Sequence, residues 1–198
     1  MIRILVINGS YRDNGITDQV IKTMTEELER VGAEVEILLL RSYPIEFCLN
    51  CRECTQQPGN QPGECIQHDA MQKLIYKIEA SDAFILASPT NFGSVTALFQ
   101  RFLERLMVYG YWPWDTNAPK CRKADVPKKK ALLISSCAAP GVLGRWIYGT
   151  RKQLKTTAQM IGANPVGILF TGLIAKDPHH RLSEKVQVKA KVLAVKLL

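Results

Sequence analysis

Two glycine-rich motifs that commonly bind phosphate are absent from the sequence. Neither G-x-G-x-x-G, typical of dinucleotide-binding folds, nor G-x-x-x-x-G-K-[ST], typical of nucleoside triphosphatases, occurs. No apolar run reaches the roughly 18 residues of a membrane-spanning helix. Met1 leads straight into an apolar run, without the charged segment of a secretory signal. There is no internal repeat and no low-complexity segment. We therefore expect a cytoplasmic protein without a membrane partner.

Composition narrows the class of protein further. The chain has 198 residues, of which 46% are hydrophobic, and this favours a single globular domain over residues 1–198. Six cysteines in such a chain favour free thiols, metal ligands or redox groups over disulfides. The net charge of +8 favours anionic small molecules as partners. The basic residues lack interleaved aromatics, so nucleic-acid binding is not expected. A basic run over residues 120–130 is expected to be a solvated loop.

Short apolar segments alternate with segments of helical periodicity along the whole chain. The strand-like runs are residues 2–7, 34–40, 83–87, 130–136 and 165–171. The helix-like segments are residues 16–31, 70–80, 96–108, 143–161 and 182–197. Five β–α repeats predict an α/β fold with a parallel sheet and helices on both faces.

The loop that follows the first predicted strand is rich in hydrogen-bond donors. Residues 8–17 read Asn-Gly-Ser-Tyr-Arg-Asp-Asn-Gly-Ile-Thr and lead into a predicted helix. A helix N-terminus attracts anions, and Ser10, Asn14 and Thr17 add side-chain donors while Arg12 adds a positive charge. This composition suits a terminal monophosphate. An ordinary helix cap beside a basic residue is the alternative.

Two further loops should meet the first one at the carboxyl edge of the sheet. Residues 88–94 read Ser-Pro-Thr-Asn-Phe-Gly-Ser, and residues 135–141 read Ser-Ser-Cys-Ala-Ala-Pro-Gly. Both bring backbone N–H groups close to a flat polar ring, and Phe92 or Tyr11 could lie against the face of that ring. A phosphate at the first loop and a heteroaromatic ring between the other two describe a flavin mononucleotide (FMN) site.

These residues carry a resemblance to a known superfamily. Gly9-Ser10-x-Arg12-x-Asn14-Gly15-x-Thr17, the loop at residues 88–94 and Phe102-x-Glu104-Arg105 resemble the flavodoxin-like superfamily, and within it the NAD(P)H-dependent FMN reductases and iron–sulfur flavoproteins. The resemblance implies a doubly wound five-stranded parallel sheet of order 2-1-3-4-5. The expected cofactor-binding residues are Ser10, Arg12, Asn14, Gly15, Ile16, Thr17, Pro89, Thr90, Asn91, Phe92, Gly93, Ser136, Cys137 and Gly141.

The expected activity is that of an FMN-dependent NAD(P)H oxidoreductase. Hydride would pass from the nicotinamide to the flavin, and then electrons to a small acceptor such as free flavin or a quinone. No catalytic acid or base is expected, since this transfer needs none. The alternative is an electron-transfer protein without its own substrate, which the basic net charge disfavours. The resemblance also implies a homodimer or homotetramer.

A cysteine-rich loop occupies residues 44–69. Cys48, Cys51 and Cys54 have two-residue gaps, and Cys65 follows a Gln/Pro/Gly-rich spacer. Four thiolates suit a [4Fe–4S] cluster or a tetrahedral zinc ion, and a metal-free thiol loop is the third possibility. The compact spacing favours a cluster over the paired cysteines of zinc sites, and the resemblance to iron–sulfur flavoproteins points the same way.

For the remaining features, a structural role is favoured over a functional one. An aromatic and basic insertion at residues 109–129 contains Tyr109, Tyr111, Trp112 and Trp114. It could cap the flavin or belong to the local core, and a subunit contact is the favoured interpretation. Cys137 is expected to be a small buried side chain before a redox group. Cys121 is expected to be exposed, His68 to lie at a helix start, and His179 and His180 at the surface.

Overall fold

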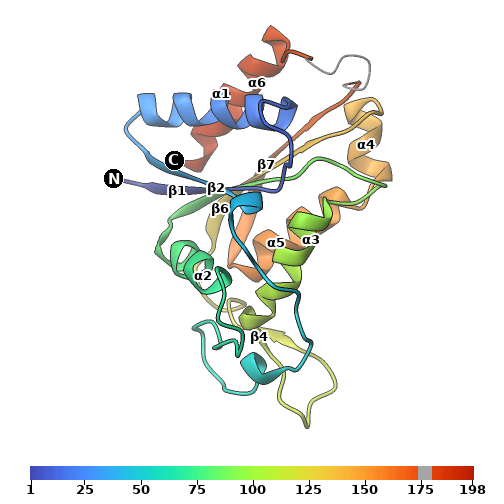
Figure 1. The fold of residues 1–198 in the computed structure, drawn as a ribbon. Helices are drawn as coiled ribbons and strands as arrows, with labels where there is room; N and C mark the ends of the chain where they lie inside the picture. Colours follow the sequence, from blue (N-terminus) through green and yellow to red (C-terminus); the bar gives the residue numbers. More distant parts are fainter. Residues whose placement is uncertain (174–179) are drawn as a thin grey trace.

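The computed structural model describes residues 1–173 and 180–198 and has a parallel five-stranded sheet at its centre (Figure 1). Its strands lie in the order β2-β1-β3-β6-β7. Numbered among themselves along the chain, these strands have the expected order 2-1-3-4-5. Their bounds are β1 Arg3–Asn8, β2 Glu34–Leu39, β3 Ala83–Ala87, β6 Lys129–Ser136 and β7 Ala163–Thr171. The doubly wound α/β fold is therefore confirmed.

Burial explains the strand sequences. All five residues of β3 are buried because helices cover both faces of this inner strand, and an unbroken apolar run suits that position. The edge strand β2 has three exposed residues. Parallel pairing aligns Asn8 of β1 with Ala87 of β3, so these two strands end at the same level. Their following loops start side by side at the carboxyl edge.

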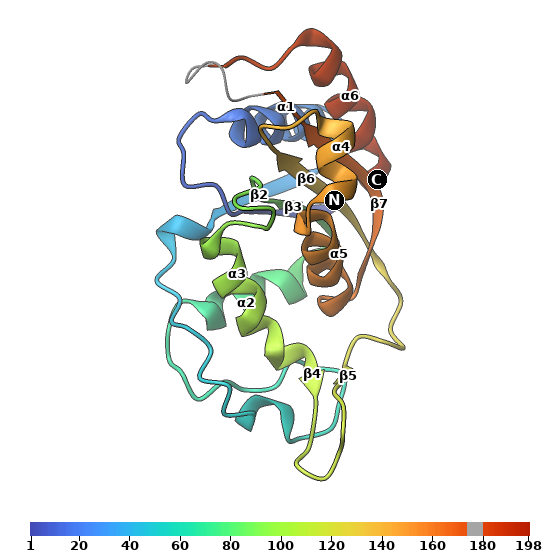
Figure 2. The same ribbon diagram turned by 90° about the vertical axis from the view of Figure 1, so that its right-hand side faces the viewer.

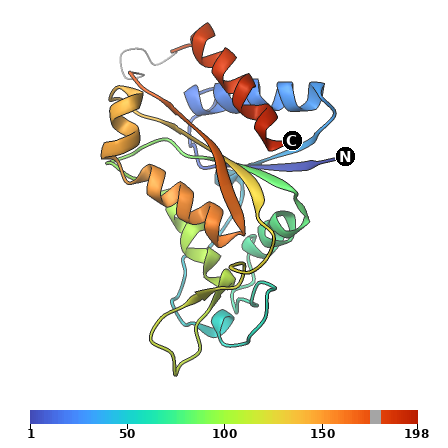
Figure 3. The ribbon, with the colours of Figure 1, turned by 180° about the vertical axis from the view of Figure 1, so that it is seen from behind.

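Two layers of helices enclose the sheet. Helices α1 (Ile16–Arg30) and α6 (Glu184–Ala194) lie side by side over one face (Figures 1 and 3). Helices α2 (Met71–Ala80), α3 (Ala97–Arg105) and α5 (Thr150–Met160) cover the other. Alternate residues of β1 point to opposite faces of the sheet, and each face has its own hydrophobic core. Ile4 packs with α1 and α6, and Leu5 packs with the opposite layer.

A lobe without much regular structure extends from the α2–α3 side. Figure 2 shows the cysteine-rich loop lying beside a hairpin of two short strands, β4 (Gly110–Tyr111) and β5 (Lys120–Cys121). Backbone bonds join the two segments, with Trp112 N–H donating to Thr55 O over 2.9 Å and Gly63 N–H donating to Val108 O over 2.8 Å. The hairpin was not expected from the sequence.

The helix predicted over residues 143–161 is wrong in one respect. It is two helices, α4 (Gly141–Ile147) and α5, with a break at Tyr148 and Gly149. Gly149 N–H donates to Gly93 O over 2.7 Å, so the chain leaves the helical path to bond a distant loop. In the described residues, no helix has the length and apolar character needed to cross a bilayer.

The basic run at residues 120–130 is also not a uniformly solvated loop. Arg122 and Lys123 are buried. Arg122 donates to the backbone oxygens of Val108, Gly110, Gly59 and Cys54 over 3.0–3.2 Å. Lys123 pairs with Glu79 at 2.6 Å. Arg122 is buried in the lobe because the buried carbonyls of the cysteine-rich loop need hydrogen-bond donors.

Candidate functional site

A polar cavity of about 230 Å³ opens at the carboxyl edge of β1, β3 and β6. Its position is the one at which doubly wound sheets bind ligands. The residues that line it come from three loops and from the segment before α6. They are Ser10, Arg12, Asn14, Gly15, Ile16, Thr17, Pro89, Thr90, Asn91, Ser136, Cys137, Ala138 and His180.

The β1–α1 loop is held in a fixed shape by its own side chains. Ser10 N–H donates to Asn8 Oδ1 over 2.8 Å, and Arg12 N–H donates to Ser10 Oγ over 3.2 Å. Asn14 adopts a left-handed conformation (φ 56°), which its short polar side chain tolerates. Arg41, which the sequence analysis did not single out, donates to Ser10 O over 2.9 Å and pairs with Asp13.

The N-terminus of α1 forms one wall of the cavity. Gly15 is the N-cap and no side chain caps the helix, so no side-chain acceptor competes with a ligand for the first-turn N–H groups. Thr17 Oγ1 and Ser136 Oγ lie 3.1 Å apart and join this wall to the end of β6. An uncapped 15-residue helix with hydroxyls and a guanidinium beside it suits an anionic group.

The loop after β3 forms the opposite wall. Thr90 N–H donates to Ser136 O over 2.8 Å, and Thr90 Oγ1 lies 3.0 Å from Ser135 Oγ. Thr96, the N-cap of α3, donates through Oγ1 to Gly9 O over 2.7 Å. A Cβ on Gly9 would lie 2.8 Å from Phe99, so only glycine permits this approach. These bonds bring the three expected loops together.

Three expected residues do not line the cavity. Phe92 has a positive φ of 48° and is fully exposed, so its ring extends into solvent. Gly93 accepts the bond from Gly149 that ends α4. A Cβ on Gly141 would lie 2.6 Å from Phe170 O, so Gly141 permits close packing against β7. Tyr11 is also exposed.

The cavity also contains residues that the site prediction missed. Ala138 lies within the predicted loop 135–141, so the loop itself was the available signal. His180 was expected at the surface, but it is half-buried and lines the cavity. Gln19 Nε2 donates to His180 O over 2.9 Å and holds the segment near α1. No sequence pattern links Gln19 to His180. His179 lies outside the described residues.

Cys137 lines the cavity and is a buried thiol, as expected. Its Sγ donates to Ala139 O over 3.3 Å, and a Cβ on Gly144 would lie 2.5 Å from that sulfur. Burial raises the pKa of the Cys137 thiol. The thiol is therefore held in its neutral form and acts as packing beneath α4.

Cys54 interacts electrostatically with the other three cysteines of the loop. Burial raises the pKa of the Cys54 thiol to about 11, and repulsion from three nearby thiolates adds to the shift. The three are Cys48, Cys51 and Cys65. In the described residues, no three His, Cys, Asp or Glu side chains are close enough to hold one metal ion. A zinc ion needs all its ligands around one point, whereas each cysteine of a [4Fe–4S] cluster binds a different iron. Four thiols are the donor set that either group takes, and Cys54 is electrostatically coupled to the other three.

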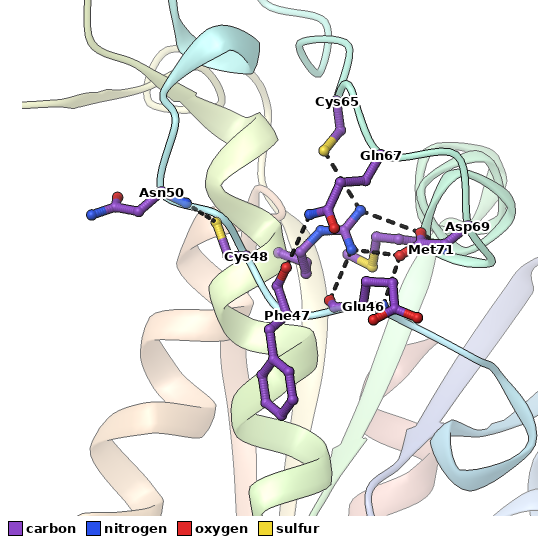
Figure 4. A network of polar contacts seen from close by, with 9 residues as sticks. Glu46, Phe47, Cys48, Asn50, Cys65, Gln67, Asp69 and Met71 are labelled. Atoms are coloured by element: carbon purple, nitrogen blue, oxygen red, sulfur yellow. Dashed lines mark hydrogen bonds and ion pairs between the residues drawn. The ribbon is translucent and has the colours of Figure 1, made fainter.

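Polar contacts hold the two arms of the cysteine-rich loop together (Figure 4). Asp69 accepts from Glu46 N–H over 2.8 Å and from Met71 N–H over 2.9 Å, at the start of α2. Gln67 Nε2 donates to Phe47 O over 3.0 Å. His68 is exposed just before this helix start. The arm that carries Cys48 is thereby tied to the arm that carries Cys65.

Part of the aromatic insertion packs within the chain itself. Tyr109 is fully buried, and its hydroxyl donates to Glu79 over 2.9 Å, so the expected subunit contact is wrong for this residue. Burial, with Glu79 nearby, raises the pKa of Tyr109. The Arg52 guanidinium lies 3.8 Å from the Trp112 ring centre and 4.4 Å from that of Trp114. We call this group the Arg52 clasp. Cys121 is partly buried rather than fully exposed.

Solved structures with the same fold include several flavin reductases. An FMN-dependent NADH-azoreductase from Bacillus anthracis, in complex with FMN, superposes with a TM-score of 0.71 at 13% identity, covering 98% of this chain and 99% of the other. An NAD(P)H:quinone oxidoreductase from Methanothermobacter marburgensis gives a TM-score of 0.69 at 13% identity, covering 98% and 96%. At this identity the likeness establishes the fold.

Relatives found by sequence indicate the family more specifically than the shared fold does. An iron–sulfur flavoprotein of Archaeoglobus fulgidus is 38% identical over 107 residues, which are 54% of this chain and 46% of that protein. An iron–sulfur flavoprotein of Clostridioides difficile is 36% identical over 105 residues, 52% of this chain and 44% of the other. The matches thus span about half the length of these curated relatives. The family model for NADPH-dependent FMN reductases matches residues 2–166, and the chain therefore belongs to that family.

Proposed function

We propose that this protein is an FMN-dependent NAD(P)H oxidoreductase that passes electrons to a small acceptor such as free flavin or a quinone. The observation that carries the proposal is the cavity at the uncapped N-terminus of α1. Its walls are the three loops that a monophosphate and a flat ring require. Family membership and the fold shared with flavin reductases support the same activity.

The β1–α1 loop is the proposed phosphate site. The first-turn N–H groups of α1, the hydroxyls of Ser10 and Thr17, and the Asn14 side chain supply neutral donors. Arg12 carries the only permanent charge among the described residues that line the cavity. Charge-assisted bonds to phosphate are stronger than neutral ones, so Arg12 is expected to contribute most for a single side chain.

The loops after β3 and β6 are the proposed ring site. A cavity of about 230 Å³ is smaller than the pockets of roughly 300–1,000 Å³ that enclose a whole ligand of this size. The phosphate and the sugar-alcohol chain would therefore occupy it, and Pro89, Thr90 and Asn91 would hold the ring. When bound, FMN supplies the acceptor for hydride from the nicotinamide. The protein's part is to bind and orient both reactants.

We further propose that Cys48, Cys51, Cys54 and Cys65 hold a [4Fe–4S] cluster. The electrostatic coupling of Cys54 to the other three thiols supports this ligand set, and the compact spacing of Cys48, Cys51 and Cys54 along the chain favours a cluster over one zinc ion. Two relatives named iron–sulfur flavoproteins support it too. A cluster in this loop would supply one-electron chemistry beside the two-electron chemistry of the flavin.

Anaerobic purification followed by visible spectroscopy tests both proposals. Bands of oxidised flavin that bleach on addition of NADH or NADPH support the oxidoreductase. Flavin bands that neither nucleotide bleaches would favour the electron-transfer alternative. Additional brown absorbance that dithionite bleaches supports the cluster, whereas a colourless protein containing zinc contradicts it.

Two cysteine variants identify the ligand set. Cys51→Ser is expected to abolish the iron and sulfide content while FMN stays bound, because the two sites share no lining residue. Cys121→Ser is the matched control, since that thiol lies in the β4–β5 hairpin near Gln159 and Met160. Unchanged iron content in Cys51→Ser would contradict the assignment.

A further inference from the structure

A buried arginine lies at the end of α3, beside the cysteine-rich loop. The side chain of Arg105 is 1% exposed. Its Nη1 donates to Asp69 Oδ2 over 2.5 Å and to Glu46 O over 2.8 Å. Its Nη2 donates to Asp69 Oδ1 over 3.2 Å and to Cys65 Sγ over 3.5 Å. A buried guanidinium thus uses both terminal nitrogens on the loop that carries the four cysteines.

These contacts place Arg105 between the two arms of the loop. Glu46 precedes Cys48 by two residues, and Asp69 follows Cys65 by four residues. Both arms contact one guanidinium, which belongs to the last residue of α3. Because α3 also begins at Thr96, which bonds Gly9 of the flavin loop, the same short helix spans from the cavity to the cysteines.

The bond to Cys65 Sγ has an electrostatic consequence. Hydrogen bonds to the sulfur ligands are among the factors that set the reduction potential of an iron–sulfur cluster. A donor on the sulfur, with a positive charge behind it, stabilises the more negative, reduced state. The adjacent Asp69 carboxylate offsets part of that charge, but the guanidinium nitrogen is the group in contact with the sulfur.

We propose that Arg105 is a positioning residue that fixes Cys65 and raises the reduction potential of the cluster that the four cysteines hold. The inference rests on the proposed [4Fe–4S] site and assigns to this chain a specific residue that tunes it. Its effect is on the one-electron acceptor and not on the flavin. Arg105 does not line the flavin cavity, so the FMN potential is independent of it.

Potentiometry of the reconstituted protein, with the cluster followed by electron paramagnetic resonance and the flavin by absorbance, tests this role. Arg105→Gln removes the donor charge and leaves Asp69 uncompensated. We expect at least a tenfold smaller reduced-to-oxidised ratio of the cluster at a given potential, equivalent to a shift of about 59 mV for one electron. Arg105→Lys keeps the charge and should shift the ratio less. The FMN potential should stay constant throughout.

Two further variants serve as controls. Arg101→Gln removes the same charge from the same helix four residues away, where the guanidinium lies 5.6 Å from the Phe47 ring centre, and should leave the cluster potential unchanged. The double variant Arg105→Gln/Asp69→Asn removes both charges and avoids a buried unpaired carboxylate. Its potential should lie between those of Arg105→Gln and the unaltered protein.

The outcomes separate this inference from the proposed cluster. An unaltered protein that binds no iron overturns both. A cluster whose potential is the same in Arg105→Gln and Arg101→Gln overturns only the role of Arg105. If every Arg105 variant folds and binds FMN but none retains iron, Arg105 serves only to shape the site, and the tuning role is overturned.

Discussion

At the scale of single residues, small polar side chains build the proposed flavin cavity and one guanidinium gives it charge. Ser10, Thr17 and Ser136 are buried with their hydroxyls at the cavity wall. Neutral donors of this kind bind a phosphate with modest gain each, because they exchange bonds with water. The permanent charge of Arg12 should therefore have the largest single effect on affinity.

Arg12→Ala is expected to weaken FMN binding by about 1.5–3 kcal/mol, because hydrogen bonds to charged groups contribute this much. Fluorescence titration of the FMN-free protein with FMN measures the change. Arg30→Ala removes an arginine from the far end of α1 and should have no effect on affinity. Equal affinities for Arg12→Ala and Arg30→Ala would remove Arg12 from the phosphate site.

Asp69 makes stability depend on pH in the acid range. Burial alone would raise the pKa of Asp69, but hydrogen bonds from Arg105, Glu46 N–H and Met71 N–H outweigh it and lower the pKa. A carboxyl with a lowered pKa in the folded state stabilises the fold above its unfolded pKa of about 3.9. That stabilisation is lost as pH falls through the folded pKa.

Urea unfolding of the metal-free protein between pH 7 and pH 2.5 should show this loss. The unaltered protein should be more stable than Asp69→Asn at pH 7, and the difference should shrink below about pH 4. Asp13→Asn removes an exposed carboxylate that pairs with Arg41 and is the control. A difference that stays constant over the whole range contradicts the role of Asp69.

At the scale of elements, the Arg52 clasp joins the cysteine-rich loop to the β4–β5 hairpin. Arg52 has a left-handed backbone (φ 64°) between Cys51 and Cys54. Its Nη2 donates to Trp112 O over 2.7 Å and to Pro113 O over 3.0 Å. The two tryptophan rings and the two carbonyl oxygens all contact the same guanidinium. The hairpin therefore fixes the conformation of the segment between Cys51 and Cys54.

Arg52→Ala should therefore lower the free energy of unfolding by about 1–3 kcal/mol, the order of magnitude expected when cation–π contacts and bonds from a charged donor are lost at a partly exposed site. It should also make the loop more sensitive to limited proteolysis. Arg151→Ala is the matched control, because that guanidinium lies 4.6 Å from the exposed Trp146 ring in a solvent-facing position. Similar losses in both variants would show that the clasp has no special role.

Elements with a strong local signal were predictable from the sequence. The buried run of β3 and the apolar periodicity of α1 each specify one structure, since their burial pattern repeats along the element. The break between α4 and α5 was not predictable, because Gly149 bonds Gly93 across the fold. The β4–β5 hairpin pairs only two residues on each strand, which is too short for a periodic pattern.

The residues of the cavity also differ in whether the sequence could predict them. The β1–α1 loop is contiguous, so its donors could be predicted together. His180 joins the site through a bond from Gln19, and Arg41 joins it through Ser10 and Asp13, all from positions distant in the sequence. The burial of Arg122 likewise depends on carbonyls from two separate segments, the cysteine-rich loop and the chain just before the β4–β5 hairpin. Such contacts depend on the tertiary structure and leave no local pattern.

At the scale of the whole molecule, an apolar surface lies beside the cavity. The surface consists of exposed residues of α4, namely Val142, Leu143, Trp146 and Ile147. Contiguous exposed apolar groups mark interaction surfaces. Because α4 follows directly after the loop that lines the cavity, we predict that a homodimer forms through this helix.

Trp146→Glu should convert the predicted dimer to a monomer by placing a charge in the predicted apolar contact. Light scattering after size-exclusion chromatography measures the mass. Val188→Glu adds the same charge to an exposed position on α6 and should leave the mass unchanged. A mass that is equal for Trp146→Glu and the unaltered protein excludes α4 from the contact.

The whole account depends on the recognition of a phosphate ester by the N-terminus of α1. The most direct measurement is isothermal titration of the FMN-free protein with FMN and, in parallel, with riboflavin, which lacks the phosphate. We predict one FMN bound per chain and at least tenfold weaker binding of riboflavin. A folded protein that binds neither compound, or binds both equally well, would contradict the account.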